Sequence, residues 1–312
     1  NIVYSDATKG WVPLNDEAVA DVPSAPVTQK AIFGYGYSGG RVSLTNLVSS
    51  SGVVATDVTG VGSARYGLAG TGYGLDKGIF GFGNPSAITG ITNLINSSGV
   101  VASDVSAVGT ARESLAAAQY GGDKAIFGFG DSGSVTNLSN LVSNSGVVAS
   151  DTTGVGTSRA TLAATRYGGD KAIFAYGYTG SKVSLSNLVS NSGVVASDTT
   201  GVGTARVLLA AAGYGGDKAI FGYGNSGSYT AITNLVSNSG VVASDVSGVG
   251  TARAALGGAS YGGDKAIFGY GNTGSTSSLT NLVSNSGVVA ADVTGVGTAR
   301  QDLSASEFST SA

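Results

Sequence analysis

The sequence of 312 residues contains no cysteine, no methionine and no histidine. Without cysteine the chain can form neither disulfide bridges nor thiolate metal sites. Without histidine it also lacks the base of the usual catalytic triads, and without cysteine it lacks a thiol nucleophile. Because 42% of the residues are hydrophobic, the chain is no disordered polar tract, and it can build a core that needs no disulfides. The absence of cysteine therefore does not exclude an extracellular location.

Charge is also scarce, since only 11% of the residues are charged and the net charge is -3. Nucleic acids bind basic surfaces, so we expect no nucleic-acid partner. No apolar run reaches the roughly 18 residues of a membrane span, so we expect no membrane insertion. The string D-x-x-G-V-G, as at 198–203, lacks both the clustered carboxylates of a calcium site and the Lys-Ser/Thr of a phosphate loop. We therefore expect no metal and no cofactor.

Glycine, by contrast, is abundant, and three sequence markers recur every 47 residues without an insertion. The markers are the lysine of KAIFGYG, the glycine of SGVVA and the arginine of GVGTAR, with close variants. Such regularity means that every copy occupies an equivalent place in one repetitive structure. The three sets are Lys30, Lys77, Lys124, Lys171, Lys218 and Lys265; Gly52, Gly99, Gly146, Gly193, Gly240 and Gly287; and Arg65, Arg112, Arg159, Arg206, Arg253 and Arg300.

One unit, residues 206–253, contains four short apolar segments: RVLLAAAGYGG, KAIFGYG, AITNLV and VVASD. Turns rich in Gly, Asn and Ser separate them, which is typical of an antiparallel meander. Four strands in a unit of about 40–50 residues are typical of a β-propeller blade. The sequence therefore predicts an all-β fold, a six-bladed β-propeller with four antiparallel strands in each 47-residue blade.

The two ends of the repeat region complement each other. The first copy starts at its second strand, near Lys30, whereas residues 300–308 form a first strand with nothing after it. Phe308 aligns with Tyr261 of the preceding copy. We predict that the C-terminal strand completes the N-terminal blade and closes the ring, because an open stack would leave two bare edges. The innermost strands of a propeller crowd around its axis, and small residues such as those at 210–212 suit that position. A β-helix is the alternative fold.

The motif G-T-A-R-x-x-L-A-A-A followed by K-A-I-F-G-Y-G resembles kelch-type propeller repeats over residues 30–308. Gly-Tyr-Gly or Gly-Phe-Gly replaces the doubled glycine of kelch, and the usual tryptophan is absent from the repeats. The stretch NIVYSDATKGWVPLNDEA resembles linkers of bacteriophage tail-fibre proteins. This resemblance implies an N-terminal extension over 1–27 that connects to a fibre shaft, a propeller over 28–312, an extracellular place on the virion, and a fibre that is often trimeric.

Most of the charged residues belong to the repeat itself, as do the Arg65 and Asp57 series. We expect these side chains to hydrogen-bond turns and to pair between neighbouring blades, with a ring of ligand sites as the alternative. The aromatic residue after the glycine of each second strand, for example Tyr35, alternates between Tyr and Phe. We expect it to pack between blades, with its hydroxyl dispensable.

Sequence differences between the copies concentrate in two segments: the loop between the second and third strands and the residues that follow each arginine, such as Tyr66, Glu113 and Val207. In a four-stranded blade both segments lie on one face, which we call the variable face. The opposite face, the turn face, carries the turns between the first and second strands. A third variable position precedes the first-strand aromatic. The loops are 37–43, 84–90, 131–137, 178–184, 225–231 and 272–278, and the third position is Gly72, Gln119, Arg166, Gly213, Ser260 and Glu307.

Exposed loops drift freely, but a binding face would also vary. The variable loops offer aromatic and polar side chains suited to stacking on and hydrogen bonding to sugars. We therefore hypothesise a non-catalytic receptor-binding domain of a phage tail fibre, which recognises a host surface glycan or receptor protein. The alternatives are a structural spacer and a carbohydrate-active enzyme, for which Glu307 is the only channel carboxylate we can name. The candidate binding residues are Tyr37, Arg41, Asn84, Asp131, Tyr178, Lys182 and Tyr229.

Overall fold

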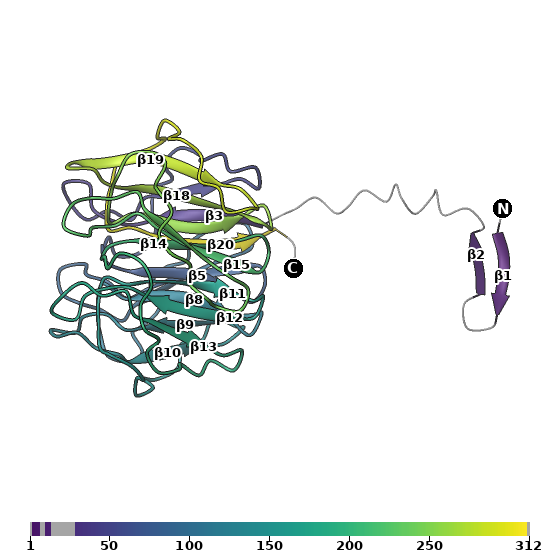
Figure 1. Ribbon diagram of the computed structural model, residues 1–312, viewed down its shortest axis with the longest axis horizontal. Coiled ribbons are helices and arrows are strands. Elements are labelled where there is room, and N and C mark those ends of the chain that lie inside the picture. Colours follow the sequence, from purple (N-terminus) through teal and green to yellow (C-terminus); the bar gives the residue numbers. More distant parts are fainter. Residues whose placement is uncertain (1, 7–9, 14–28, 311–312) are drawn as a thin grey trace.

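The computed structural model describes residues 2–6, 10–13 and 29–310 (Figure 1). All regular secondary structure in these residues is β-strand, so none of them forms a helix that could span a membrane. Strands β1 (Ile2–Asp6) and β2 (Gly10–Pro13) pair antiparallel in a sheet of their own. Residues 14–28, where the predicted boundary between extension and repeats falls, lie outside the described residues, as does most of the predicted shaft connection.

Six three-stranded antiparallel sheets make up residues 29–310, and in each sheet the second strand of the repeat lies between the first and third. This all-β arrangement of repeated sheets is consistent with a β-propeller-like fold. In chain order they are sheet 1 (β20 Ser304–Ser309, β3 Gln29–Gly34, β4 Thr45–Val48), sheet 2 (β5 Ala69–Tyr73, β6 Lys77–Gly81, β7 Thr92–Ile95), sheet 3 (β8 Ala116–Tyr120, β9 Lys124–Gly128, β10 Ser139–Val142), sheet 4 (β11 Ala163–Tyr167, β12 Lys171–Ala175, β13 Ser186–Val189), sheet 5 (β14 Ala210–Tyr214, β15 Lys218–Gly222, β16 Thr233–Val236) and sheet 6 (β17 Gly257–Tyr261, β18 Lys265–Asn272, β19 Thr276–Val283).

The C-terminal strand completes the N-terminal sheet, as the sequence predicts. β20 pairs with β3 so that Phe308 lies opposite Lys30, in the register that places Tyr261 opposite Lys265 in sheet 6. The first strands of the six sheets contact one another in the order β20, β5, β8, β11, β14 and β17, and β17 contacts β20 again. The neighbours of these strands therefore form a cycle, and sheet 1 joins the two ends of the repeat region (Figure 1).

Two rings of main-chain hydrogen bonds reinforce this cycle. In the ring on the variable face, the main-chain N–H groups of six residues with φ between 52° and 63° each donate to the carbonyl of the preceding member of the ring at 2.7–3.0 Å. On the turn face, a second ring of hydrogen bonds links the turn between the first and second strands of each sheet to the neighbouring sheet. The hydrogen bond from Ser309 N to Asp76 O closes this ring at 3.0 Å. The members of the first ring are Gly67, Ser114, Thr161, Leu208, Ala255 and Asp302.

The predicted fourth strand is not a regular strand in any of the six sheets. The VVASD segment pairs with the third strand through two isolated bridges in each sheet, for example Val54 with Val48 and Val58 with Thr45. The side-chain amide of Asn46 donates to the carbonyl of Ala55, which interrupts the ladder between the two bridges. The structure therefore shows three strands in each sheet instead of the predicted four, with an irregular fourth segment at the outer edge.

The repeated arginines lie between neighbouring sheets and are fully buried. Arg65 Nε donates to the carbonyl of Phe82 at 2.8 Å, and its Nη2 donates to Asn93 Oδ1 at 2.6 Å, both in sheet 2. Its guanidinium also lies over the ring of Tyr35 from sheet 1, 4.3 Å from the centroid. A desolvated cation–π contact can contribute about 2 kcal/mol, so each arginine stabilises one sheet and its contact with the preceding one.

The repeated aspartates extend the same network. Asp104 accepts hydrogen bonds from the main chain and hydroxyl of Ser63 and from the amide of Asn93. Asp57 and Thr298 make the equivalent contact where the chain ends meet, at 2.6 Å. The prediction that repeated Asp and Arg side chains bind turns and neighbouring sheets is confirmed.

The repeated aromatic residues pack between sheets, as predicted. The Tyr35 ring meets Phe80 of sheet 2 edge-on at 5.4 Å, and Phe33 meets Tyr270 of sheet 6 at 5.2 Å. Gly34 leaves room for this packing, because a Cβ there would lie 2.8 Å from the Phe80 ring. The Tyr35 hydroxyl donates a hydrogen bond to the carbonyl of Val61 at 2.9 Å, a contact that the sequence did not reveal.

Replacing one buried arginine tests its role in joining the sheets. Arg206→Ala removes hydrogen bonds to the carbonyl of Tyr223 and to Asn234 and exposes a gap beneath the Tyr176 ring. We expect the free energy of unfolding to fall by about 3 kcal/mol or more, because buried acceptors lose a charged donor. Chemical denaturation measures the loss. The control Arg41→Ala removes an exposed arginine and should cost less than about 1 kcal/mol; equal losses would contradict the prediction.

The aspartate network predicts a loss of stability in acid. Burial opposes ionisation of Asp245, but hydrogen bonds from Thr204 and Asn234 outweigh it and hold the pKa below its usual 3.8. The same holds for the five equivalent aspartates, Asp57, Asp104, Asp151, Asp198 and Asp292. Because the unfolded chain then binds protons more readily than the folded protein, the stability present above pH 3.8 is lost as the pH falls through the folded-state pKa. Denaturation across this range should show a shallower decline for Asp245→Asn than for the unaltered protein, and an identical decline would contradict the assignment.

Candidate functional site

The two variable segments meet on one face, as the sequence predicts. Each loop between the second and third strands begins with a residue that forms an isolated bridge with the residue after an arginine. The closing pair joins Tyr37 near the start of the repeats to Gln301 near their end. The other pairs are Tyr66 with Asn84, Glu113 with Asp131, Ala160 with Tyr178, Val207 with Asn225 and Ala254 with Asn272.

Three of the predicted binding residues form a cluster between sheets 1 and 2. The rings of Tyr37 and Tyr66 meet edge-on at 6.2 Å, and the Arg41 guanidinium lies 5.4 Å from the centre of the Tyr66 ring. Arg41 Nε donates to the carbonyl of Asn84 at 3.1 Å. Tyr66 joins the predicted residues into one surface. The sequence marks it only as a variable position after an arginine, and the ring contacts give it a role.

The remaining predicted residues belong to other sheets and do not join this cluster. Asp131 Oδ1 accepts from the main chain of Gly133 at 2.8 Å. Tyr178, which is 45% exposed, bridges to Lys182 in the same loop of sheet 4. Tyr229 is half-buried, and its hydroxyl donates to Asn272 Oδ1 of sheet 6 at 3.1 Å. Since sheets 1 and 4 are three steps apart in the cycle of six, Tyr37 and Tyr178 lie on opposite sides of the face.

The centre of the variable face holds a small recess of about 70 Å³. Its lining combines the six residues of the hydrogen-bonded ring with leucines such as Leu68, and Asp302 supplies its only charged side chain. Burial raises the pKa of Asp302, while a hydrogen bond from Gln301 Nε2 at 2.9 Å acts in the opposite sense. The sequence shows Asp302 only as the second residue after an arginine, so its central position needed the ring to be closed.

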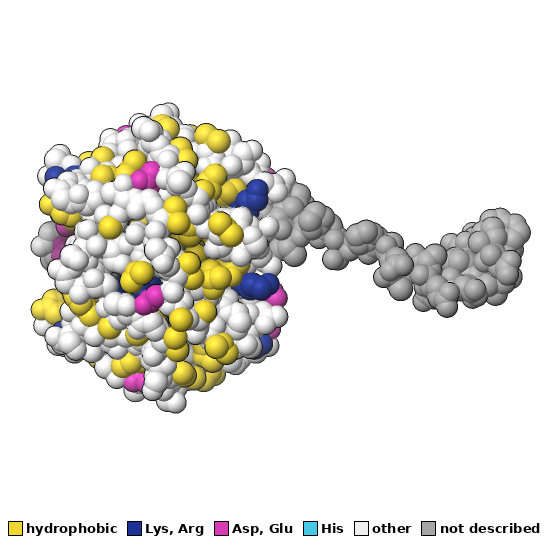
Figure 2. Space-filling view, turned by 90° about the horizontal axis from the view of Figure 1, so that it is seen from above, with side chains coloured by type: hydrophobic (Ala, Val, Ile, Leu, Met, Phe, Trp, Pro, Cys, Tyr) yellow, Lys and Arg dark blue, Asp and Glu magenta, His cyan; other side chains and the backbone are white. Residues whose placement is uncertain are grey.

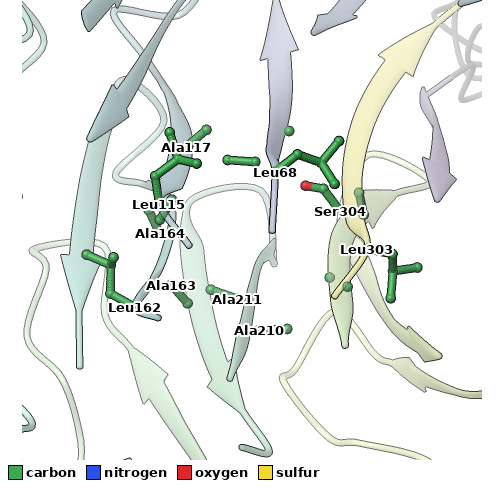
Figure 3. Close-up of a pocket in the computed structure, with 16 residues that line it drawn as sticks. Leu68, Leu115, Ala117, Leu162, Ala163, Ala164, Ala210, Ala211, Leu303 and Ser304 are labelled. Atoms are coloured by element: carbon green, nitrogen blue, oxygen red, sulfur yellow. The ribbon is translucent and has the colours of Figure 1, made fainter. Parts of the chain in front are cut away.

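Beneath this recess, leucine, alanine and glycine residues surround the axis, together with Ser304. Figure 3 shows Leu68, Leu115 and Leu162, which each come directly before a first strand, with small residues of the first strands such as Ala211 around one opening. Small side chains at these positions confirm the expectation that the innermost strands are crowded. Glu307 lies elsewhere: it lines recesses towards the turn face that share no residue with the recess of Asp302.

The variable face can bind by stacking and hydrogen bonding. Its exposed tyrosines and Arg41 offer ring faces and a planar cation. Figure 2 views the six sheets from the side and shows that charged side chains are sparse on that surface as well. The described residues contain no group of three or more side chains that could hold a metal ion. No model of a known protein family matches the chain, and no curated protein shows significant sequence similarity to it.

Neutralising Asp302 tests the assignment of the central recess. A folded-state pKa above the unfolded one means that the ionised carboxylate destabilises the fold, so stability declines as the pH rises through this range. Asp302→Asn keeps the acceptor for Gln301 and removes the charge. Thermal unfolding should therefore give a higher Tm for the variant at about pH 7 and equal values at about pH 3. A lower Tm for the variant at the higher pH would contradict the assignment.

Proposed function

We propose that the six sheets are the blades of a closed six-bladed β-propeller, each with the irregular VVASD segment as its fourth strand. The cyclic order of the first strands and the two rings of main-chain hydrogen bonds support this proposal. In a propeller the first strands line the axis, and alternate connections lie on opposite faces. That geometry makes the variable face one of the two flat faces of a disk.

We further propose that this disk is the receptor-binding domain of a phage tail fibre, which attaches to a glycan on the host surface without catalysis. The observation that carries the proposal is the placement of the variable residues on the face away from the start of the repeats. Gln29, where β3 begins, accepts a hydrogen bond from Gly262 in the ring of the turn face. The variable face is therefore directed away from the point where the chain enters the disk, which is the direction of a target. The resemblance of residues 1–18 to tail-fibre linkers favours the same function.

The side chains of the variable face favour a glycan over an apolar ligand. Tyr37 and Tyr178 are 38% and 45% exposed, so ring surface is accessible for stacking on sugar rings. Arg41 and Lys182 stand beside them and can donate to hydroxyl or carboxylate oxygens. Because the two tyrosines lie on opposite sides of the face, each forms a separate shallow contact. Several weak contacts on one repetitive surface polymer would add up through multivalency.

A glycan-array screen of the labelled protein, with whole bacterial cells alongside, tests this function. We expect selective binding that the double variant Tyr37→Ala/Tyr178→Ala weakens at least about tenfold, as loss of two stacking aromatics predicts. Lys124→Ala on the turn face is the matched control and should bind as the unaltered protein does. Binding to cells but not to glycans would indicate a protein receptor. Equal binding by the double variant and the control would contradict the placement of the site.

A structural spacer is the second candidate, and contacts between the loops favour it. Arg41 and Tyr229 occupy equivalent positions in two copies, and each bonds to the next sheet, through Asn84 and Asn272 respectively. Variable residues thus also fasten neighbouring sheets. The spacer predicts that the protein binds neither glycans nor cells, and that Tyr229→Phe lowers stability by about 1 kcal/mol through its lost hydrogen bond.

A further inference from the structure

The axis of the cycle ends on the turn face in a recess of about 100 Å³ that breaks the sixfold regularity of the chain. Four sheets contribute to it, and all of its polar side chains except Lys77 come from positions that differ between copies. The polar lining residues are Gln29, Lys77, Gln119, Arg166 and Glu307.

Two opposite charges line this recess without neutralising each other. Arg166 extends from β11 of sheet 4 and Glu307 from β20 of sheet 1, which lie across the axis from each other. No ion pair or side-chain hydrogen bond joins either group to another of the described residues. The Nε donor of Arg166 is buried and lacks a partner. An unsatisfied buried donor costs roughly 1–3 kcal/mol. The Nη groups of Arg166 also have no hydrogen-bond partner among the described residues, but they are not buried, so a ligand in the recess can accept hydrogen bonds from them.

Glycines lie beside both charged side chains. A Cβ on Gly72 would lie 2.9 Å from Cγ of Glu307, and a Cβ on Gly213 would lie 3.5 Å from Nε of Arg166. Glu307 would therefore have to move for a larger residue at position 72, whereas a Cβ at position 213 would make an ordinary van der Waals contact with Arg166. Gln119, which is 8% exposed and has no side-chain hydrogen bond among the described residues, adds an amide from the sheet between them.

The rim of the recess carries a strained apolar residue. Leu75 has a φ of 72° and is 63% exposed, although four other copies of this turn have glycine there. A left-handed backbone costs a non-glycine residue of order 1 kcal/mol. Leu75 lines this recess, so its side chain offers a ligand an apolar contact that glycine could not provide. The four glycines are Gly122, Gly169, Gly216 and Gly263.

We propose that this recess binds a small organic anion that carries a carboxylate and, beside it, hydroxyl or ammonium donors. The carboxylate accepts from Arg166, the donors bond to Glu307 and Gln119, and the carbon skeleton contacts Leu75. A hexuronic acid and a free hydroxy amino acid share this chemistry. The site lies on the turn face and is independent of the proposed glycan contacts on the variable face.

Ligand-observed NMR and calorimetry with the whole protein test the site. The probes are D-glucuronate and L-serine, with D-glucose and propionate as controls that lack the carboxylate and the donors respectively. We expect glucuronate or serine to bind with a Kd of about 1 mM or below and both controls to bind at least about tenfold more weakly. Tighter binding of glucuronate would identify a hexuronic acid as the ligand, and tighter binding of serine would identify a hydroxy amino acid. Binding of neither, or equal binding of glucose, would overturn the proposal.

Variants taken from other copies of the repeat separate binding from folding. Arg166→Gln introduces the residue that Gln119 provides in sheet 3, and Glu307→Gln is its counterpart across the axis. Each should weaken binding at least about tenfold, since charged hydrogen bonds are lost, and leave the Tm unchanged or higher. Arg41→Gln on the variable face should leave binding of the probe unchanged.

Substitution of the rim residue provides a second readout. Leu75→Gly should raise the free energy of unfolding by relieving the strained backbone and at the same time weaken ligand binding. If Arg166→Gln or Leu75→Gly bound the probe as tightly as the unaltered protein, the recess would not be the site.

Discussion

The buried arginines are the interaction on which the rest of the structure depends. Each one covers the ring of an aromatic residue in the preceding sheet, and all but Arg112 also donate from Nε to the carbonyl of the equivalent aromatic in their own sheet, as Arg300 does with Tyr270 and Tyr35 respectively. The charge thus holds two sheets at a fixed distance and angle. Because the arginine is fully buried, it must keep all of these partners. An asparagine of the third strand and an aspartate at the end of a VVASD segment complete the surroundings of the arginine. These contacts restrict the position of the third strand and of the segment that leads to the next sheet.

This constraint explains which sequence features can vary. Residues that contact the arginine side chain recur in nearly every copy, whereas the loops and the residues after each arginine lie outside the contacts of its guanidinium and differ. Variation is therefore directed to one face by the packing of the sheets. On the turn face the turns are nearly constant, and the differences gather around the recess that Leu75, Arg166 and Glu307 line.

Much of the fold could be predicted from the sequence, because every copy repeats the same local pattern. The period located the strands, and the alignment of Phe308 with Tyr261 gave the pairing of β20 with β3. The irregular outer segment could not be predicted, since the side chain of Asn46 competes with main-chain groups that look free in the sequence. Likewise, the site residues were found as variable positions, but only closure of the cycle shows that Tyr37 and Tyr178 are far apart and that Asp302 is central.

The pairing of β20 with β3 has a consequence for the order of assembly. A ribosome releases the sheets from the N-terminus onwards, and sheets 2 to 6 consist of strands that are adjacent in the chain. Sheet 1 alone waits for residues 304–309, so the edge of β3 and the space for Arg300 stay unfilled until the sixth sheet has been synthesised. The nascent protein therefore passes through a nearly complete stack with one open seam, which β20 closes.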